Sequence, residues 1–212
     1  MSKVTIVVAV FAALLAADET GLDTEPGLVR VFFNSAGLSR PHDTGVDSTI
    51  DVDTGTTIND YSRVWQSRIA APVAAEVAFA AEADNGCRLW IGNVLVIDGW
   101  AEDGPRRGVF TFNNAGPSLP IRVEYHQCGG TGHMRLFREW AGHPRELVPA
   151  SALTHTAEDR EKTETLMKTS PRVGKMCPSR SPMHGCTRPA AKHPAWNLFA
   201  LPGARTSSST IT

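Results

Sequence analysis

Residues 28–140 contain a series of short segments in which apolar and polar side chains alternate, with Gly and Pro between the segments. In residues 121–125, Ile, Val and Tyr fall on one face and Arg and Glu on the other. An alternation of period two is typical of strands with one buried face, and no segment in this region has the stripe of an amphipathic helix. The sequence therefore predicts an all-β sandwich or barrel of antiparallel strands. The expected strands are residues 28–33, 73–83, 88–91, 94–97, 109–112, 121–125 and 134–137.

Residues 88–91 and 94–97 are two strongly apolar segments separated only by Gly92 and Asn93. Glycine at the first central position of a two-residue loop suits the turn types that join hairpin strands. This pair is predicted to form a tight β-hairpin.

The N-terminus has the pattern of an export signal. Lys3 precedes an apolar run over 4–17 that ends abruptly at Asp18 and Glu19. Such a run is too short to cross a bilayer as a helix, whereas it fits a secretory signal peptide. We expect residues 1–17 to be that signal and residues 18–26 to be a linker. No second long apolar run follows, so no transmembrane segment is expected.

Charge is distributed unevenly along the 212 residues, although the formal net charge is only −1. Residues 18–154 hold 18 acidic residues and 11 arginines but no lysine, whereas residues 155–212 hold nine basic and four acidic residues. The near-neutral total gives no reason to expect nucleic-acid binding. The last segment is basic and rich in Pro, Ser and Thr, so we expect a disordered, low-order C-terminal tail apart from a short helix over 158–168.

The central segments also resemble the PA14 domain family, which typically carries a "DDG-x-RLW-(I/V)-DG-x-LVID-x-W" block. Here residues 84–100 read DNGCRLWIGNVLVIDGW. An "EY" strand, a Gly-rich turn, an "RLYW"-like strand and an "IPAS-x-L" end follow in the family. Their counterparts here are residues 121–125, 129–132, 135–137 and 148–153, and the domain is expected to cover residues 27–154.

The resemblance implies a β-barrel or sandwich module of an extracellular protein that binds or spaces and does not catalyse. In sugar-binding adhesins of the family, two adjacent Asp residues hold a calcium ion that coordinates sugar hydroxyls, which suits the oxygen preference of calcium. The matching residues here are Asp84 and Asn85, which become the candidate ligand-binding and calcium-binding pair.

Two departures from the family pattern weaken this calcium site. Asn85 replaces a carboxylate by an amide, and Cys128 stands where an Asn is common, although a thiol is a poor ligand for a hard cation. The alternative is that Asp84 and Asn85 only shape a tight turn.

Trp100 is the candidate aromatic platform for a sugar ring, because it follows the hairpin in a loop with Asp98 and Gly99. Sugar C–H groups pack against such ring faces, and Asp98 could accept hydrogen bonds beside it. The alternative is that Trp100 packs the loop down. Trp90 lies in the middle of an expected strand and is predicted to belong to the core.

A second acidic stretch contains Asp51 and Asp53 at the spacing of the first ligands of a calcium loop. Gly55 and Ser62 stand where further oxygen ligands are required, so a solvated loop is the favoured interpretation. Other members of the stretch are Asp47, Asn59 and Asp60.

Four cysteines allow three disulfide connectivities in an exported protein. The pairing that we favour is Cys87–Cys128 within the domain and Cys177–Cys186 within the tail. The alternative for the tail is a zinc site, formed by Cys177, His184, Cys186 and His193, whose spacing matches no standard zinc finger.

These observations predict a non-catalytic carbohydrate-binding module that is secreted or held at the cell surface or in the periplasm, with a glycan or cell-surface polysaccharide as its partner. The alternative is a structural or spacer module, such as a fragment of a larger surface protein or glycosidase. No Gly-x-Ser-x-Gly or His-Glu-x-x-His motif supports an enzyme. The glycan and the oligomeric state are left open.

Overall fold

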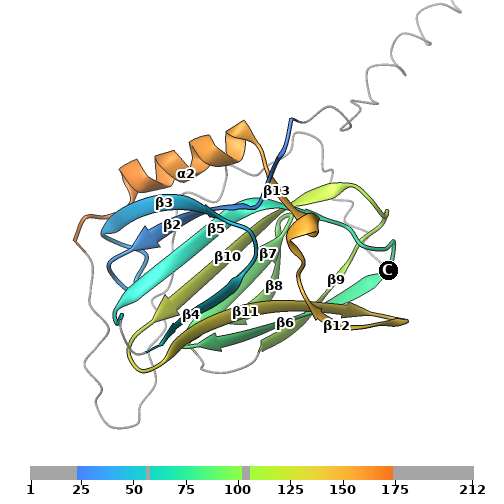
Figure 1. Ribbon diagram of the computed structural model, residues 1–212, viewed down its shortest axis with the longest axis horizontal. Helices are drawn as coiled ribbons and strands as arrows, with labels where there is room; N and C mark the ends of the chain where they lie inside the picture. Colours follow the sequence, from blue (N-terminus) through green and yellow to red (C-terminus); the bar gives the residue numbers. More distant parts are fainter. Residues whose placement is uncertain (1–22, 56–57, 102–105, 174–212) are drawn as a thin grey trace, which may run out of the picture.

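The alternating segments form two antiparallel sheets that face each other in the computed structural model, which describes residues 23–55, 58–101 and 106–173 (Figure 1). The larger sheet has eight strands in the order β1-β13-β5-β10-β7-β8, with β2 pairing β5 and β3 pairing β2. The smaller sheet has five strands in the order β12-β11-β6-β9, with β4 pairing β11. The predicted all-β class is confirmed, and the arrangement is a sandwich.

The elements have the following bounds. The larger sheet contains β1 (Glu25–Pro26), β2 (Leu28–Phe33), β3 (Pro41–Asp47), β5 (Tyr61–Ala70), β7 (Gly86–Ile91), β8 (Val94–Gly99), β10 (Ser118–Gln127) and β13 (Leu153–His155). The smaller sheet contains β4 (Asp51–Gly55), β6 (Glu76–Asp84), β9 (Arg106–Thr111), β11 (Gly132–Trp140) and β12 (His143–Leu147). A short 3-10 helix η2 (Ala150–Ala152) precedes β13, and the helix α2 (Ala157–Thr169) follows it.

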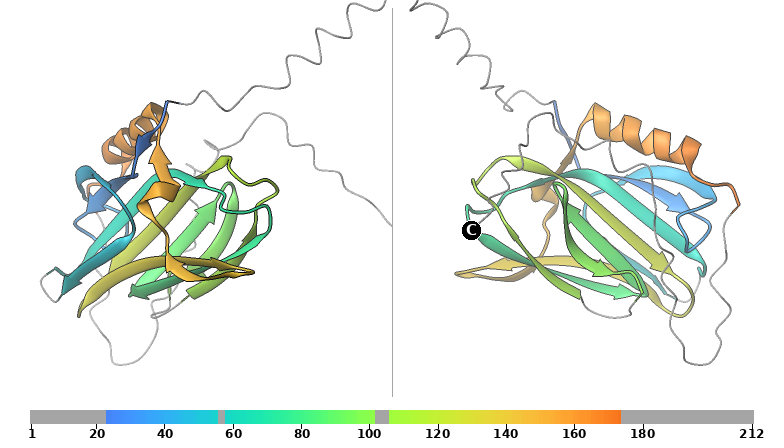
Figure 2. Two further views of the ribbon diagram at one scale, coloured as in Figure 1. Left: turned by 45° about the vertical axis from the view of Figure 1, so that its right-hand side comes forward. Right: turned by 180° about the vertical axis from the view of Figure 1, so that it is seen from behind.

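The main hydrophobic core lies between the two sheets, which Figure 2 shows as separate layers. On β7, Leu89 and Ile91 are buried in this core, whereas Trp90 points to the other face and is only half-buried. The prediction that Trp90 belongs to the core is therefore wrong, because strand alternation assigns that position to the outer face. The large indole at the centre is Trp65 of β5, which is 0% exposed.

The folded domain extends beyond residue 154, the boundary predicted from the sequence. The helix α2 lies over β2 and β3 on the outer face of the larger sheet (Figure 1), and its Leu166 and Met167 pack against a small cluster around Phe33. A capping box between Thr156 and Asp159 begins the helix. The predicted short helix is confirmed as α2, and it packs on the domain instead of standing apart in a tail.

The predicted linker over residues 18–26 also ends in structure. Glu25 and Pro26 form β1 and pair with β13, and the Glu25 carboxylate bonds the Arg160 side chain at 2.6 Å. This hydrogen bond lowers the pKa of Glu25 and links the start of the domain to α2.

The acidic stretch before β5 is largely strand and not the solvated loop that we expected. Asp51 belongs to β4 and bonds Arg135 of β11 at 2.9 Å. Asp47 ends β3 and accepts hydrogen bonds from Arg30 at 3.2 Å and from the Trp65 indole at 2.8 Å. These carboxylates are paired with cations across strands, so they do not form a calcium loop.

Several predictions fall on residues that the structure does not describe. They are the signal peptide of residues 1–17, the tail from residue 174, the Cys177–Cys186 pairing and the alternative zinc site. Within the described ranges, no helix has the length and apolar character needed to span a membrane.

The predicted Cys87–Cys128 disulfide is wrong. Cys87 is a free, buried cysteine, whereas Cys128 is disulfide-bonded. The alternation of β7 turns the Cys87 side chain into the core with Leu89 and Ile91, whereas Cys128 follows the end of β10.

We expect Cys87 to resist alkylation as long as the protein stays folded. Burial raises the pKa of its thiol to about 12, so almost no reactive thiolate is present at mildly alkaline pH. Peptide mapping after iodoacetamide treatment should find Cys87 modified only when denaturant is added. Modification at the same rate with and without denaturant would contradict the buried position.

Candidate functional site

Two connections between the sheets lie side by side at one end of the sandwich. The first crosses from β6 to β7 at Asp84 and Asn85, and the second crosses from β10 to β11 over residues 128–131. The strand register places His133 opposite Asp84 and His126 opposite Gly86. The Asp84–Asn85 peptide bond is cis. We call the two connections together the loop end.

The Asn85 side chain is bonded at both of its polar ends. Its Nδ2 donates to Oδ1 of Asp84 at 3.0 Å, and its Oδ1 accepts from the backbone N–H of Cys128 at 2.6 Å. The Asn85 backbone N–H donates to the His126 carbonyl at 3.1 Å. Asn85 therefore joins the two connections and holds the Asp84 carboxylate in place.

A chain of buried hydroxyls supports the same turn from inside the sandwich. The Tyr125 hydroxyl donates to the Asp84 carbonyl at 2.7 Å and accepts from the Tyr61 hydroxyl at 3.3 Å. The Tyr61 hydroxyl oxygen lies 3.0 Å from Oγ1 of Thr54. Burial raises the pKa of Tyr125, so the phenol stays protonated and keeps its donor role.

The glycines of the second connection leave room beside these side chains. Gly130 has φ +95°, a conformation that favours glycine, and a Cβ there would lie 4.0 Å from Oδ2 of Asp84. A Cβ at Gly129 would lie 3.8 Å from Oδ1 of Asn59. Apart from the glycine itself and its neighbours in the chain, no other atom of the described residues lies within 4 Å of either position. A carboxylate and an amide thus border the glycine turn.

Trp100 packs against the loop end and does not project from it. Its ring lies 4.4 Å from the His126 ring, and the guanidinium of Arg88 lies 4.7 Å from its centroid. The Trp100 carbonyl accepts from Nε2 of His126 at 2.8 Å. Asp98 bonds the same Arg88 at 3.1 Å. The packing alternative thus describes Trp100 better than an open platform, and Asp98 is directed toward Arg88.

Replacing Gly86 by Ala should disturb this end of the fold. A Cβ at Gly86 would lie 2.2 Å from the Trp100 carbonyl oxygen and 2.4 Å from Nε2 of His126. The Trp100 loop must move to make room, so we expect a loss of about 1–3 kcal/mol in the free energy of unfolding. Chemical denaturation would measure it, with Gly45→Ala on β3 as the comparison, because a Cβ there would meet only the guanidinium end of Arg30, which is a flexible side chain. Equal, small losses in both variants would contradict this packing.

The donor atoms at the loop end do not fit a calcium ion as they stand. Calcium takes six to eight oxygen ligands, and tight sites supply several carboxylates. Here Asp84 receives an N–H from Asn85, the amide oxygen of Asn85 is already bonded to Cys128, and the Cys128 sulfur is in a disulfide. No group of three or more His, Cys, Asp or Glu side chains in the described parts of the chain is placed to hold a metal ion.

The structure thus brings Asp84 and Asn85 together, joins Trp100 to them through His126, and leaves Asp98 with Arg88. Sequence reasoning missed His126 and the role of Asn59. The role of His126 depends on the pairing of β10 with β7, which cannot be predicted from the local sequence around His126.

Comparisons with known proteins agree with this architecture. The PA14 domain model matches residues 24–145. The chain is 27% identical over 138 residues to the anti-sigma-I factor RsgI3 of Acetivibrio thermocellus, covering 61% of this chain and 21% of that protein. It is 32% identical to the structure of an anti-sigma factor domain-containing protein from Clostridium clariflavum, with a TM-score of 0.58 over 61% of this chain and 47% of the other.

The same fold occurs in the A domain of epithelial adhesin 6 from Candida glabrata, solved in complex with Galβ1-3GlcNAc. That structure has a TM-score of 0.53, 9% sequence identity, and coverage of 65% of this chain and 90% of the other. The chain spans about a fifth of the length of RsgI3 and about half of the Clostridium structure. Because the family model covers more than half of the residues, from the first strand to β12, the chain belongs to the PA14 domain family.

Proposed function

We propose that this domain is a non-catalytic carbohydrate-binding module of an exported protein, and that the glycan binds at the loop end. The observation that carries the proposal is the position of the Asp84 carboxylate, which borders the glycine turn and accepts a hydrogen bond from Asn85. Tyr125 holds the backbone carbonyl of the same residue. A fixed carboxylate can accept two hydroxyl hydrogen bonds from a sugar with little loss of side-chain freedom. Asn59 offers a second polar group on the other side of the glycines.

The relationship to sugar-binding domains supports the choice of ligand. The adhesin A domain that shares this fold was crystallised with a disaccharide. We extend that ligand class, and no particular sugar, to this chain. A glycan or cell-surface polysaccharide as partner also agrees with export, which the apolar run over residues 4–17 predicts.

We propose further that this binding does not depend on calcium. The side-chain amide Nδ2 of Asn85 donates a hydrogen bond to Oδ1 of Asp84 at 3.0 Å. In a calcium site, the cation would lie against this carboxylate oxygen instead. The neutral amide thereby holds the acidic side chain without a metal ion. Binding that requires calcium would contradict this proposal, because Asp84 and Asn85 would then hold a calcium ion as the matching Asp pair does in the sugar-binding adhesins.

The test is a glycan-array screen of the full chain, repeated with Asp84→Ala. Loss of a charge-assisted hydrogen bond should weaken binding about tenfold or more while the protein stays folded. Asp43→Ala is the matched control, because Asp43 is an exposed carboxylate on β3 that pairs with Arg30. Equal binding by Asp84→Ala and the natural chain would reject the loop end as the site.

A structural or spacer module is the second candidate function. This candidate is supported by the match to the anti-sigma-I factor RsgI3, which covers only 21% of that protein. Such partial coverage is expected of a module that is joined to other domains. A folded sample that binds no glycan in the screen would favour this candidate.

A further inference from the structure

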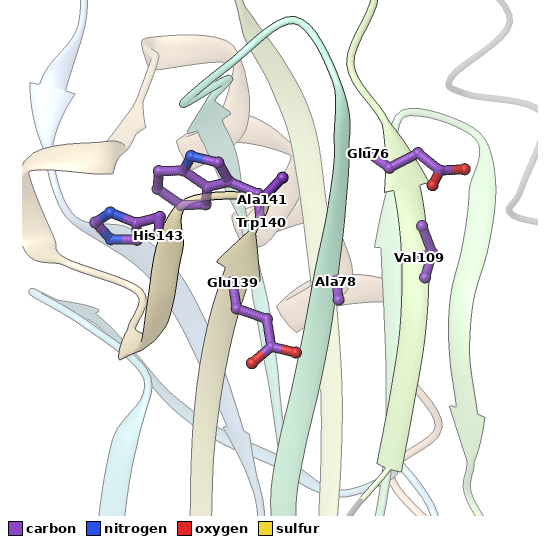
Figure 3. Close-up of a pocket in the computed structure, with 7 residues that line it drawn as sticks. All are labelled: Glu76, Ala78, Val109, Glu139, Trp140, Ala141 and His143. Atoms are coloured by element: carbon purple, nitrogen blue, oxygen red, sulfur yellow. The ribbon is translucent and has the colours of Figure 1, made fainter.

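A hollow lies on the outer face of the smaller sheet, at the opposite end from Asp84. It is open to solvent, has a volume of about 420 Å³ and is bordered by β6, β9, β11 and the turn into β12 (Figure 3). Glu76 begins β6 and Asp84 ends it, so the two ends are separated by roughly 26 Å at the usual strand rise. The hollow shares no residue with the loop end.

The floor of the hollow is made by small and exposed apolar side chains. Ala78 lies on the middle strand and faces outward, because its neighbours Val77 and Phe79 are buried in the core. Its register partners are Val109 on β9 and Glu139 on β11, both with longer side chains. The short methyl between two longer groups creates the depression, and Val109 is 54% exposed within it.

One wall of the hollow is a stacked pair of rings. The Trp140 and His143 rings are 3.9 Å apart and inclined by 4°. Glu146 holds the pair in place, because it bonds Nε2 of His143 at 3.2 Å and Nε of Arg138 at 2.8 Å. The hydrogen bond from Arg138 lowers the pKa of Glu146, so the carboxylate stays ionised at neutral pH. The aromatic wall is therefore fixed before any ligand arrives.

Two carboxylates stand at the rim of the hollow (Figure 3). Glu76 is exposed, and Glu139 is held by the Arg107 guanidinium. Carboxylate oxygens accept hydrogen bonds from hydroxyls but repel other carboxylates. The hollow thus combines an apolar floor, a rigid aromatic wall and hydroxyl acceptors.

We propose that this hollow is a second carbohydrate site, which takes a neutral pyranose unit. The C–H face of the sugar packs on Val109 and the Trp140–His143 pair, and its hydroxyls donate to Glu76 and Glu139. Uronic acids are disfavoured chiefly by the exposed Glu76 carboxylate, because Arg107 balances the charge of Glu139. The site has the ligand class of the proposed function but none of its residues, so either site can fail alone.

The test follows the Trp140 indole N–H by NMR in the full chain, with the signal identified from the spectrum of Trp140→Phe. The probes are methyl β-glucopyranoside, methyl β-galactopyranoside, N-acetylglucosamine and galacturonic acid. At least one neutral sugar should move the signal in a saturable way, and galacturonic acid should not. Ala78→Gln fills the floor and should weaken this binding at least tenfold. Ala80→Gln, the next outward position on β6 and not part of the lining, should leave it unchanged.

Asp84→Ala in the same titration separates the two sites, since it should not alter the response of Trp140. The proposal is overturned if no neutral sugar moves the indole signal, if galacturonic acid moves it as strongly, or if Ala78→Gln and Ala80→Gln bind alike. An Asp84→Ala variant that abolishes the Trp140 response would also overturn it, because the response would then report the loop end.

Discussion

Replacing Asn85 by Asp is expected to give the loop end a calcium affinity that the natural chain lacks. The change removes the N–H that faces Asp84 and places a second carboxylate beside the first. Two adjacent carboxylates repel each other unless a cation lies between them, and calcium prefers such oxygen pairs. The variant should be less stable than the natural chain in chelator, and calcium at a hundred times its dissociation constant should add about 2.7 kcal/mol.

Thermal unfolding in calcium and in chelator measures this effect. Asn93→Asp is the matched control, because it adds the same charge in the β7–β8 loop at the other end of the strand. The natural chain and the control should unfold at the same temperature in both buffers. An Asn85→Asp variant that also ignores calcium would show that the remaining oxygens at the loop end are placed differently from this account.

Replacing Trp65 by Ala is expected to be the most destabilising change in the core. The indole is fully buried between the sheets, and its N–H donates to Asp47 at 2.8 Å. Removing a buried Trp side chain leaves a cavity and costs about 3–5 kcal/mol, a large part of the stability of an ordinary domain. The Asp47 carboxylate would also lose its indole donor and keep only Arg30.

Urea denaturation followed by circular dichroism would measure this loss. Trp65→Phe keeps most of the apolar volume and loses only the N–H and part of the ring, so its loss should be clearly smaller. Trp90→Ala is the second comparison, because Trp90 lies on the outer face of β7 and is half-buried. A smaller loss for Trp65→Ala than for Trp90→Ala would contradict the assignment of the central core.

The hairpin and most strands with one wet face were predictable from alternation alone. Strand β5 could not be predicted in this way, although it lies in the middle of the larger sheet. Its Val64 lies in the cluster beneath α2 and its Trp65 lies in the main core, so both faces are buried and no polar face marks the strand. Buried Ser62 adds a polar residue where an apolar one is usual, since it bonds the Ser35 carbonyl at 2.6 Å.

The candidate site could be predicted only in part, for a similar reason. The motif identified Asp84 and Asn85, and the substitution by Asn85 raised the question of calcium. The answer depends on what Asn85 bonds. Its side-chain oxygen accepts from the backbone N–H of Cys128, and its own backbone N–H donates to the His126 carbonyl, so both partners come from β10 and the connection that follows it. The stacked pair of Trp140 and His143 depends in the same way on the turn between β11 and β12.

The most direct test of the central claim is a glycan-array screen of the natural full chain in calcium and again in chelator. The full chain is needed because α2 completes the domain. We expect the same glycans to be bound in both buffers with similar strength. Binding that chelator abolishes would contradict calcium-independent recognition at Asp84 and Asn85, and a folded sample that binds nothing in either buffer would contradict the carbohydrate-binding function itself.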